Sequence, residues 1–152
     1  MHFFGMKGPR KRFGFKIMTR RQAREELINL LFETEFRSDE SAEAIFATSC
    51  ENREIADDEY LRRAYFAIIE NLEKIDATIG KHAHGWKTSR LGRVSRAVLR
   101  MGVYELLFET DIPATVTINE AVELVKALDD EKARPFVNGV LNSVKDSIGA
   151  QK

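Results

Sequence analysis

The sequence predicts an all-α protein of about seven helices in two small packed helical bundles. Apolar residues recur at spacings of three and four along most of the 152-residue chain, and no segment alternates apolar and polar residues as a strand would. With 43% hydrophobic and 32% charged residues, the chain has enough apolar surface for a core. We expect a flexible basic arm over residues 1–17. The helical part, 18–152, should divide near Gly80 into subdomains of about 18–81 and 82–152.

The first expected helix begins after Thr19, which with Gln22 matches a capping box. The core-facing stripe of this helix consists of Ala23, Leu27, Leu30, Leu31 and Thr34. Ser38 and Asp39 are expected to end this helix. A weaker helix is expected near 41–51, with these residues on its buried side: Ala44, Ile45 and Thr48.

Asp57 and Asp58 are expected to begin the longest helix, because acids in a first turn suit the macrodipole. Its seam, spaced by four and three, is Leu61, Tyr65, Ile68, Leu72, Ile75 and Ile79. Gly80 is expected to end this helix.

The second half predicts a short helical piece near 86–91 and a helix over about 94–108. Thr117 and Glu120 match a second capping box, which would begin the next helix. Pro135 suits the first turn of the last helix. The core side of that last helix would be Phe136, Val137, Val140, Leu141, Val144 and Ile148.

Charge is unevenly distributed along the chain, although 24 basic and 24 acidic residues give a formal net charge of zero. The first 24 residues hold eight basic residues and no acid, so residues 25–152 carry a net charge of −8. The eight are Lys7, Arg10, Lys11, Arg12, Lys16, Arg20, Arg21 and Arg24. A basic segment on an acidic body indicates a polyanionic partner.

Arg20, Arg21 and Arg24 are predicted to lie in the first two turns of a helix, where positive charge opposes the macrodipole. Helix-start amides and arginine forks would both favour phosphate, so we interpret this cluster as an RNA-binding site. The alternative is a solvated basic turn that improves solubility.

A second basic stretch, free of acids from Ala77 to Tyr104, places Arg93, Arg96 and Arg100 on one helix face. Arg93 and Arg96 could extend the RNA surface. Arg100 is expected instead to be a structural arginine paired with Glu105 or Glu120.

Aromatic side chains among basic residues could stack on unpaired bases. In the arm these are Phe3, Phe4, Phe13 and Phe15. Phe136, beside Lys132 and Arg134, is a further candidate, although a core position is common for such a residue. The other phenylalanines at helical spacing are expected in the core: Phe32, Phe36 and Phe108.

Nothing in the sequence indicates an enzyme, a cofactor or a metal site. There is no glycine-rich phosphate loop or nucleophile motif, Cys50 is the single cysteine, and the spacing of His82 and His84 does not suit a helical zinc site. No apolar run could span a bilayer and no secretory signal is present, so a cytoplasmic location is expected.

Four blocks, in order, resemble the NusB family of bacterial transcription antitermination factors. They are Arg20–Glu25 with the following Leu27–Phe32, then Arg96–Leu106, Val116–Leu124 and Phe136–Leu141. Each block alone is a weak match, and the four in register are specific. Pro135 departs from the family, in which a basic residue usually precedes the aromatic residue.

The resemblance implies binding, together with the ribosomal protein NusE, to the boxA element of nascent ribosomal RNA transcripts, within an RNA polymerase antitermination complex. The family's arginine-rich first helix maps onto Arg20, Arg21 and Arg24, and its second RNA-contacting segment maps onto Lys132 and Phe136. A homodimer is also compatible with the family. Two alternatives stay open: a protein-interaction module without RNA binding, and an RNA-binding domain related to RNA cytosine methyltransferases.

Overall fold

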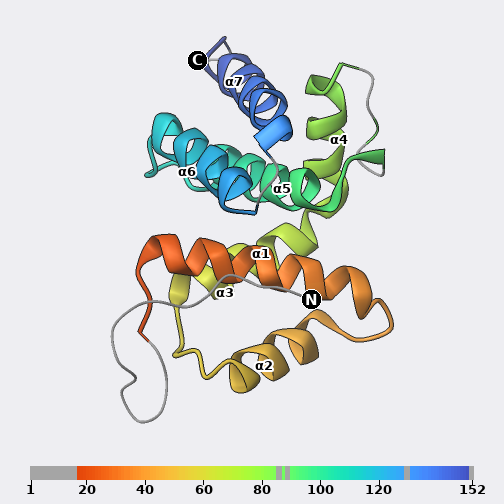
Figure 1. Ribbon diagram of the computed structural model, residues 1–152, viewed down its shortest axis with the longest axis vertical. Coiled ribbons are helices and arrows are strands. Elements are labelled where there is room, and N and C mark those ends of the chain that lie inside the picture. Colours follow the sequence, from red (N-terminus) through yellow and green to blue (C-terminus); the bar gives the residue numbers. More distant parts are fainter. Residues whose placement is uncertain (1–16, 85–86, 88–89, 129–130, 151–152) are drawn as a thin grey trace. The chain divides into compact units, whose positions relative to one another are not determined.

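The computed structural model describes residues 17–84, 87, 90–128 and 131–150. These residues form seven α-helices, which confirms the predicted all-α class (Figure 1). The helices are α1 (Arg20–Phe36), α2 (Ala42–Asn52), α3 (Glu59–Glu70), α4 (Leu72–His82), α5 (Arg93–Phe108), α6 (Ala114–Ala127) and α7 (Arg134–Ala150). A 3-10 turn, η2 (Glu131–Ala133), directly precedes α7. The expected arm lies outside the described residues, as do residues 86, 88 and 89 of the short piece near 86–91.

The chain divides into two compact units, with the boundary between Ile69 and Glu70. We call them the N-terminal unit and the C-terminal unit. The expected folding subdomains of about 18–81 and 82–152 stay a prediction.

In the N-terminal unit, α1 begins with the capping box that the sequence predicts. The Thr19 hydroxyl oxygen accepts a hydrogen bond from the Gln22 amide at 3.1 Å, and the Gln22 side-chain oxygen accepts one from the Thr19 amide at 2.9 Å. Ser41 caps α2 by accepting from the Ala44 amide at 3.1 Å. Both caps satisfy amides that have no partner inside their helix.

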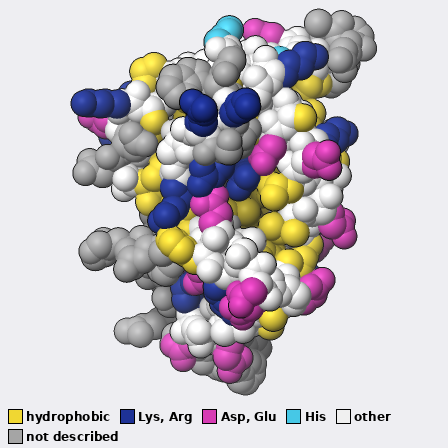
Figure 2. Space-filling view, turned by 90° about the vertical axis from the view of Figure 1, so that its right-hand side faces the viewer, with side chains coloured by type: hydrophobic (Ala, Val, Ile, Leu, Met, Phe, Trp, Pro, Cys, Tyr) yellow, Lys and Arg dark blue, Asp and Glu magenta, His cyan; other side chains and the backbone are white. Residues whose placement is uncertain are grey.

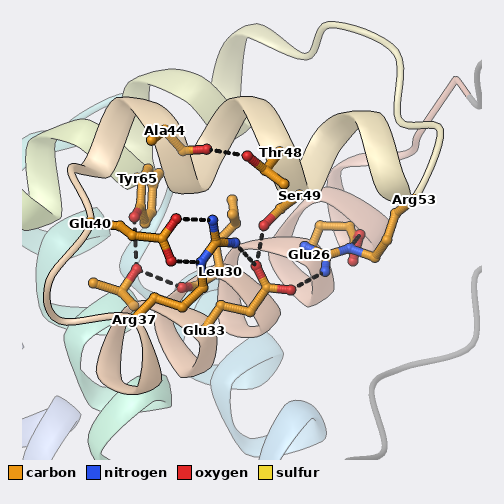
Figure 3. Close-up of polar contacts among 11 residues, drawn as sticks. Glu26, Leu30, Glu33, Arg37, Glu40, Ala44, Thr48, Ser49, Arg53 and Tyr65 are labelled. Carbon is orange, nitrogen blue, oxygen red and sulfur yellow. Dashed lines mark hydrogen bonds and ion pairs between the residues drawn. The ribbon is translucent and has the colours of Figure 1, made fainter.

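The buried side of α2 differs from the prediction. Ile45 and Ser49 are buried, whereas Ala44 and Thr48 are exposed. Thr48 donates a hydrogen bond to the Ala44 carbonyl at 2.7 Å, on the outer surface of α2. The reason is that a polar residue, Ser49, faces α1 and donates to Glu33 (Figure 3).

Ionic side chains bind α2 to α1. Arg53, at the C-cap of α2, reaches Glu26 at 2.8 Å and Glu33 at 2.6 Å, both on α1 (Figure 3). Glu26 is fully buried and also accepts from the Asn29 amide group at 2.7 Å. On the α3 side, the Tyr65 hydroxyl lies 2.7 Å from that of Thr34. These contacts hold the three helices of this unit together.

The predicted long helix is in fact two helices, α3 and α4. Asp58 accepts from the Leu61 amide at 2.8 Å and so caps α3, as its position in the sequence suggests. Asn71 interrupts the helix with φ −109° and ψ 21°, and α4 then continues through Gly80 to His82. The prediction that Gly80 ends the helix was therefore wrong.

In the C-terminal unit, α5 contacts α4, α6 and α7. Gly102 lets α7 approach closely, since a β-carbon there would lie 2.8 Å from both δ carbons of Leu141. Arg100 forms two hydrogen bonds to Asp76 of α4, at 2.9 and 2.8 Å. These bonds give Arg100 a structural role, with Asp76 as a partner that sequence reasoning had missed. The expected pairing of Arg100 with Glu105 or Glu120 stays a prediction.

The predicted start of α6 was wrong. The helix begins at Ala114 after Pro113, so Thr117 lies inside it rather than at its N-cap. Thr117 is fully buried and donates a hydrogen bond to the buried Glu105 of α5 at 2.7 Å. Its hydroxyl therefore joins two helices instead of capping one.

Two of the three phenylalanines expected in the core are exposed. Phe32 is buried, but Phe36 is 54% exposed and Phe108 is 39% exposed. Both lie at the last residue of their helices. Because each helix ends there, no further helical turn follows that could cover the ring.

Candidate nucleic-acid interface

The first turn of α1 presents positive charge at the helix end where negative charge is favoured. It contains no acid, and Arg20 and Arg21 are both exposed. The macrodipole places partial positive charge at the same end, so each arginine there costs about 0.3–1 kcal/mol at low ionic strength. An approaching anion would remove this cost.

Arg24 differs from these two, because only 3% of it is exposed. Its guanidinium carbon lies 5.8 Å from the centroid of the Tyr60 ring, which belongs to α3. The Arg20 guanidinium lies over the same ring at 4.3 Å, and that of Arg63 lies 5.9 Å away. Guanidinium groups from two helices thus lie around the Tyr60 ring.

Sequence reasoning missed Tyr60 and Arg63. Both follow the Asp57–Asp58 helix start, where acids and an aromatic residue look like an ordinary amphipathic first turn. No local signal connects them to residues about 40 positions earlier. A tyrosine beside arginines on one predicted helix was the available hint, and it does not identify the partner helix.

The second basic stretch lies in the C-terminal unit. Arg93, the first residue of α5, is exposed, and Arg96 is half-buried with one guanidinium nitrogen donating to the Leu91 carbonyl at 2.8 Å. The first turn of α5 contains no acid, as in α1. In Figure 2, lysine and arginine side chains are spread over the upper half of the face that it draws, with acidic side chains among them.

The third group of predicted residues lies around the start of α7. Lys132 is exposed in η2, and Phe136 is half-buried in the first turn of α7. A surface hollow of about 490 Å³ lies at the start of α7. It is lined by Val122, Glu131, Arg134, Pro135 and Asn138. Of the seven predicted RNA-binding residues, three therefore lie in the N-terminal unit and four in the C-terminal unit.

The side chains that most often serve as nucleophile or base are placed for structure. Burial raises the pKa of the Cys50 thiol to about 11, so it stays protonated at neutral pH. Burial also lowers the pKa of His82, whose ring Nδ1 lies 2.7 Å from the Ser143 hydroxyl of α7. Within the described ranges, no three His, Cys, Asp or Glu residues are grouped as metal ligands would be. None of the helices described is both long and apolar enough to cross a membrane.

Fold and site together define an all-α protein that presents basic residues at the starts of two helices. The chain belongs to the NusB family, whose sequence model matches residues 21–146. A relative from Bacillus pumilus, transcription antitermination protein NusB, is 38% identical over 134 residues, which is 88% of this chain and all of the relative. The family predicted by resemblance and its function in transcription antitermination are thereby confirmed.

Two solved structures share the fold. NusB of T. maritima is 39% identical and has a TM-score of 0.75, with 85% of this chain and 92% of that chain covered. A complex of antitermination factors NusB and NusE with double-stranded RNA contains a chain that is 33% identical. Its TM-score is also 0.75, and the match covers 84% of this chain and 96% of that chain. The names of these relatives are those of a transcription factor, which supports the prediction that this chain is not an enzyme.

Proposed function

We propose that this protein, together with NusE, binds the single-stranded boxA element of nascent ribosomal RNA transcripts and acts within the RNA polymerase antitermination complex. The observation that carries the RNA-binding part is the exposed pair Arg20 and Arg21 in a helix turn without acids. The solved complex of a family member with NusE and double-stranded RNA supports the choice of NusE and RNA as partners. The role places the protein in the cytoplasm, where bacterial transcripts are made.

The start of α1 cannot neutralise its own positive charge, and the phosphates of the bound RNA do so. Arg20 and Arg21 supply charge-assisted hydrogen bonds, and the macrodipole adds to the attraction for an anion. Arg24, buried beside Tyr60, adds positive potential behind them. Because each phosphate contact releases counterions, affinity for RNA should fall steeply with salt.

The C-terminal unit supplies the second set of contacts in this proposal. The exposed Arg93 and Lys132 bind phosphate, and Arg96 adds positive potential from a half-buried position. Phe136 stacks on an unpaired base beside the hollow at the start of α7. Sequence preference would come from this stacking and from NusE, because phosphate contacts carry no base information.

A binding assay tests the proposal. Fluorescence anisotropy of a labelled boxA-like RNA is measured with the protein alone, with NusE alone and with both, beside a scrambled strand of equal composition. We expect the pair to bind the boxA-like RNA at least tenfold more tightly than either protein does and to discriminate against the scrambled strand. Equal affinity for both strands with NusE present would contradict the boxA assignment. Binding of NusE by a protein that binds neither strand, alone or with NusE, would favour a protein-interaction module.

A further inference from the structure

Cationic side chains from α1 and α3 lie around the ring of Tyr60. The guanidinium carbons of Arg20, Arg24 and Arg63 lie 4.3, 5.8 and 5.9 Å from its centroid. Tyr60 itself is only 3% exposed, so the ring is held in place by its surroundings. Arg20 is exposed, and the Arg63 side chain is 43% exposed.

Three positive groups around one ring would repel one another without compensation. The distances to the ring place every two guanidinium carbons within about 12 Å, which is comparable to the Debye length of about 10 Å at 0.1 M salt. The negative face of an aromatic ring attracts a guanidinium by about 0.5–1 kcal/mol at exposed sites. Tyr60 therefore offsets part of the repulsion and keeps the cluster assembled before a ligand arrives.

Arg63 can exchange its present acidic partner for a phosphate. Its guanidinium lies 3.3 Å from Glu59, whose side chain is 87% exposed. Such exposed ion pairs are worth little, because water and salt screen them. An arginine fork binds a phosphate through stronger, paired hydrogen bonds. The neighbouring Arg62 is 45% exposed and pairs instead with Asp57, at the start of α3.

We propose that α3 forms part of the RNA-binding surface of the N-terminal unit. Arg63 contacts a backbone phosphate next to the one held by Arg20. Tyr60 is a positioning residue that holds both guanidinium groups ready. The ligand is the single-stranded RNA of the proposed function, on which this inference rests, and the inference extends the surface beyond the arginine-rich helix.

The neighbouring arginines of α3 provide a matched test. Arg63→Gln and Arg62→Gln each remove one charge at nearly equal exposure. We expect Arg63→Gln to reduce the slope of log K against log salt by about 0.7, the value of one phosphate contact on a single strand. Arg62→Gln should leave the slope unchanged. Equal slopes for Arg63→Gln and the wild type would overturn the inference.

Arg21→Gln separates this inference from the proposed function. If Arg21→Gln lowers the slope and Arg63→Gln does not, RNA binding stands and the role of α3 is refuted. If neither changes the slope of a chain that binds RNA, the proposed function of the α1 arginines fails as well. An equal fall for Arg62→Gln and Arg63→Gln would indicate only a long-range charge effect and would also refute the specific contact.

Variants of Tyr60 test its positioning role. Tyr60→Phe keeps the ring and should retain RNA affinity within about twofold, whereas Tyr60→Leu should lose about two- to fivefold. In a background that already carries Arg20→Gln and Arg63→Gln, Tyr60→Leu should cause little further loss, because the ring has no exposed arginine left to position. A loss of the same size in that background would show a merely structural role. Should Tyr60→Leu not fold, the Arg62 and Arg63 comparison still decides the inference.

Discussion

Glu26 places a carboxylate among the fully buried side chains of α1 and receives donors from Arg53 and Asn29. A buried charge is tolerated only while its partners remain. Glu33, the second carboxylate on Arg53, is less dependent on it, because Arg37 also lies within 3.8 Å. The stability of the contact between α1 and α2 therefore depends on the Glu26–Arg53 pair.

Arg53→Ala should lower the free energy of unfolding by about 3 kcal/mol, because it leaves the Glu26 carboxylate buried without its cation. Urea denaturation monitored by circular dichroism measures this loss. Arg37→Ala, which removes a more exposed ion pair with Glu40, should cost about 1 kcal/mol or less. Equal losses for the two variants would contradict the account.

His82 makes stability depend on pH. Burial, with a smaller contribution from neighbouring positive charges, lowers the pKa of His82 below its usual value of 6.5 in the folded protein. The unfolded chain therefore binds the proton more readily. The resulting stability is present above pH 6.5 and is lost as the pH falls through the lower pKa of the folded state.

Replacing His82 by Asn keeps a polar group near Ser143 and removes the titration. Between pH 7.5 and 5.5, the wild type should lose more unfolding free energy than His82→Asn does, as measured from urea midpoints at each pH. A variant with the same pH dependence as the wild type would show that His82 does not contribute.

Some residues of the candidate site could be predicted from the sequence, and others could not. Arg20 and Arg21 could be recognised as exposed basic residues at a helix start, because that inference needs only local pattern and the macrodipole. The burial of Arg24 could not be predicted from the sequence, because it depends on where the Tyr60 ring of another helix lies. Glu26 and Glu33 lie on one face of α1, but their spacing does not reveal Arg53 as the partner.

Helix boundaries differ in how well the sequence predicts them. The pattern threonine, two residues, then glutamine or glutamate occurs at Thr19 and again at Thr117, but only the first is a cap. The same spacing is common inside helices, where residues three apart share a face. At α6, Pro113 sets the start three residues before the apparent cap. At Asn71 the apolar seam continues across the break, so periodicity cannot show it.

Thr117 provides a test at the scale of helix packing. Thr117→Val has nearly the same shape but removes the hydrogen bond from α6 to Glu105 of α5. We expect a loss of about 1.5–3 kcal/mol in unfolding free energy, the usual value for a hydrogen bond to a charged group. Thr117→Ser should recover most of it. If the valine variant is as stable as the wild type, the hydroxyl does not hold the two helices together.

For the molecule as a whole, charge distribution and fold carry the functional argument together. The all-α class and the family could be predicted from periodicity and from four sequence blocks in register. The candidate surface could be predicted only in part, because Tyr60 and Arg63 join it through tertiary packing. The net charge of zero is the sum of an acidic body and a basic N-terminal segment. This asymmetry favours the binding of RNA at the start of α1.

The ionic-strength dependence of RNA binding by an Arg20→Gln/Arg21→Gln variant tests the central claim most directly. If each of these arginines contacts one phosphate, the slope of log K against log salt should become shallower by about 1.4, with weaker binding of every single strand. Arg37→Gln, just beyond the other end of α1, should leave the slope as it is in the wild type. A double variant whose slope and affinity equal those of the wild type would contradict the claim that phosphate neutralises the charge at this helix start.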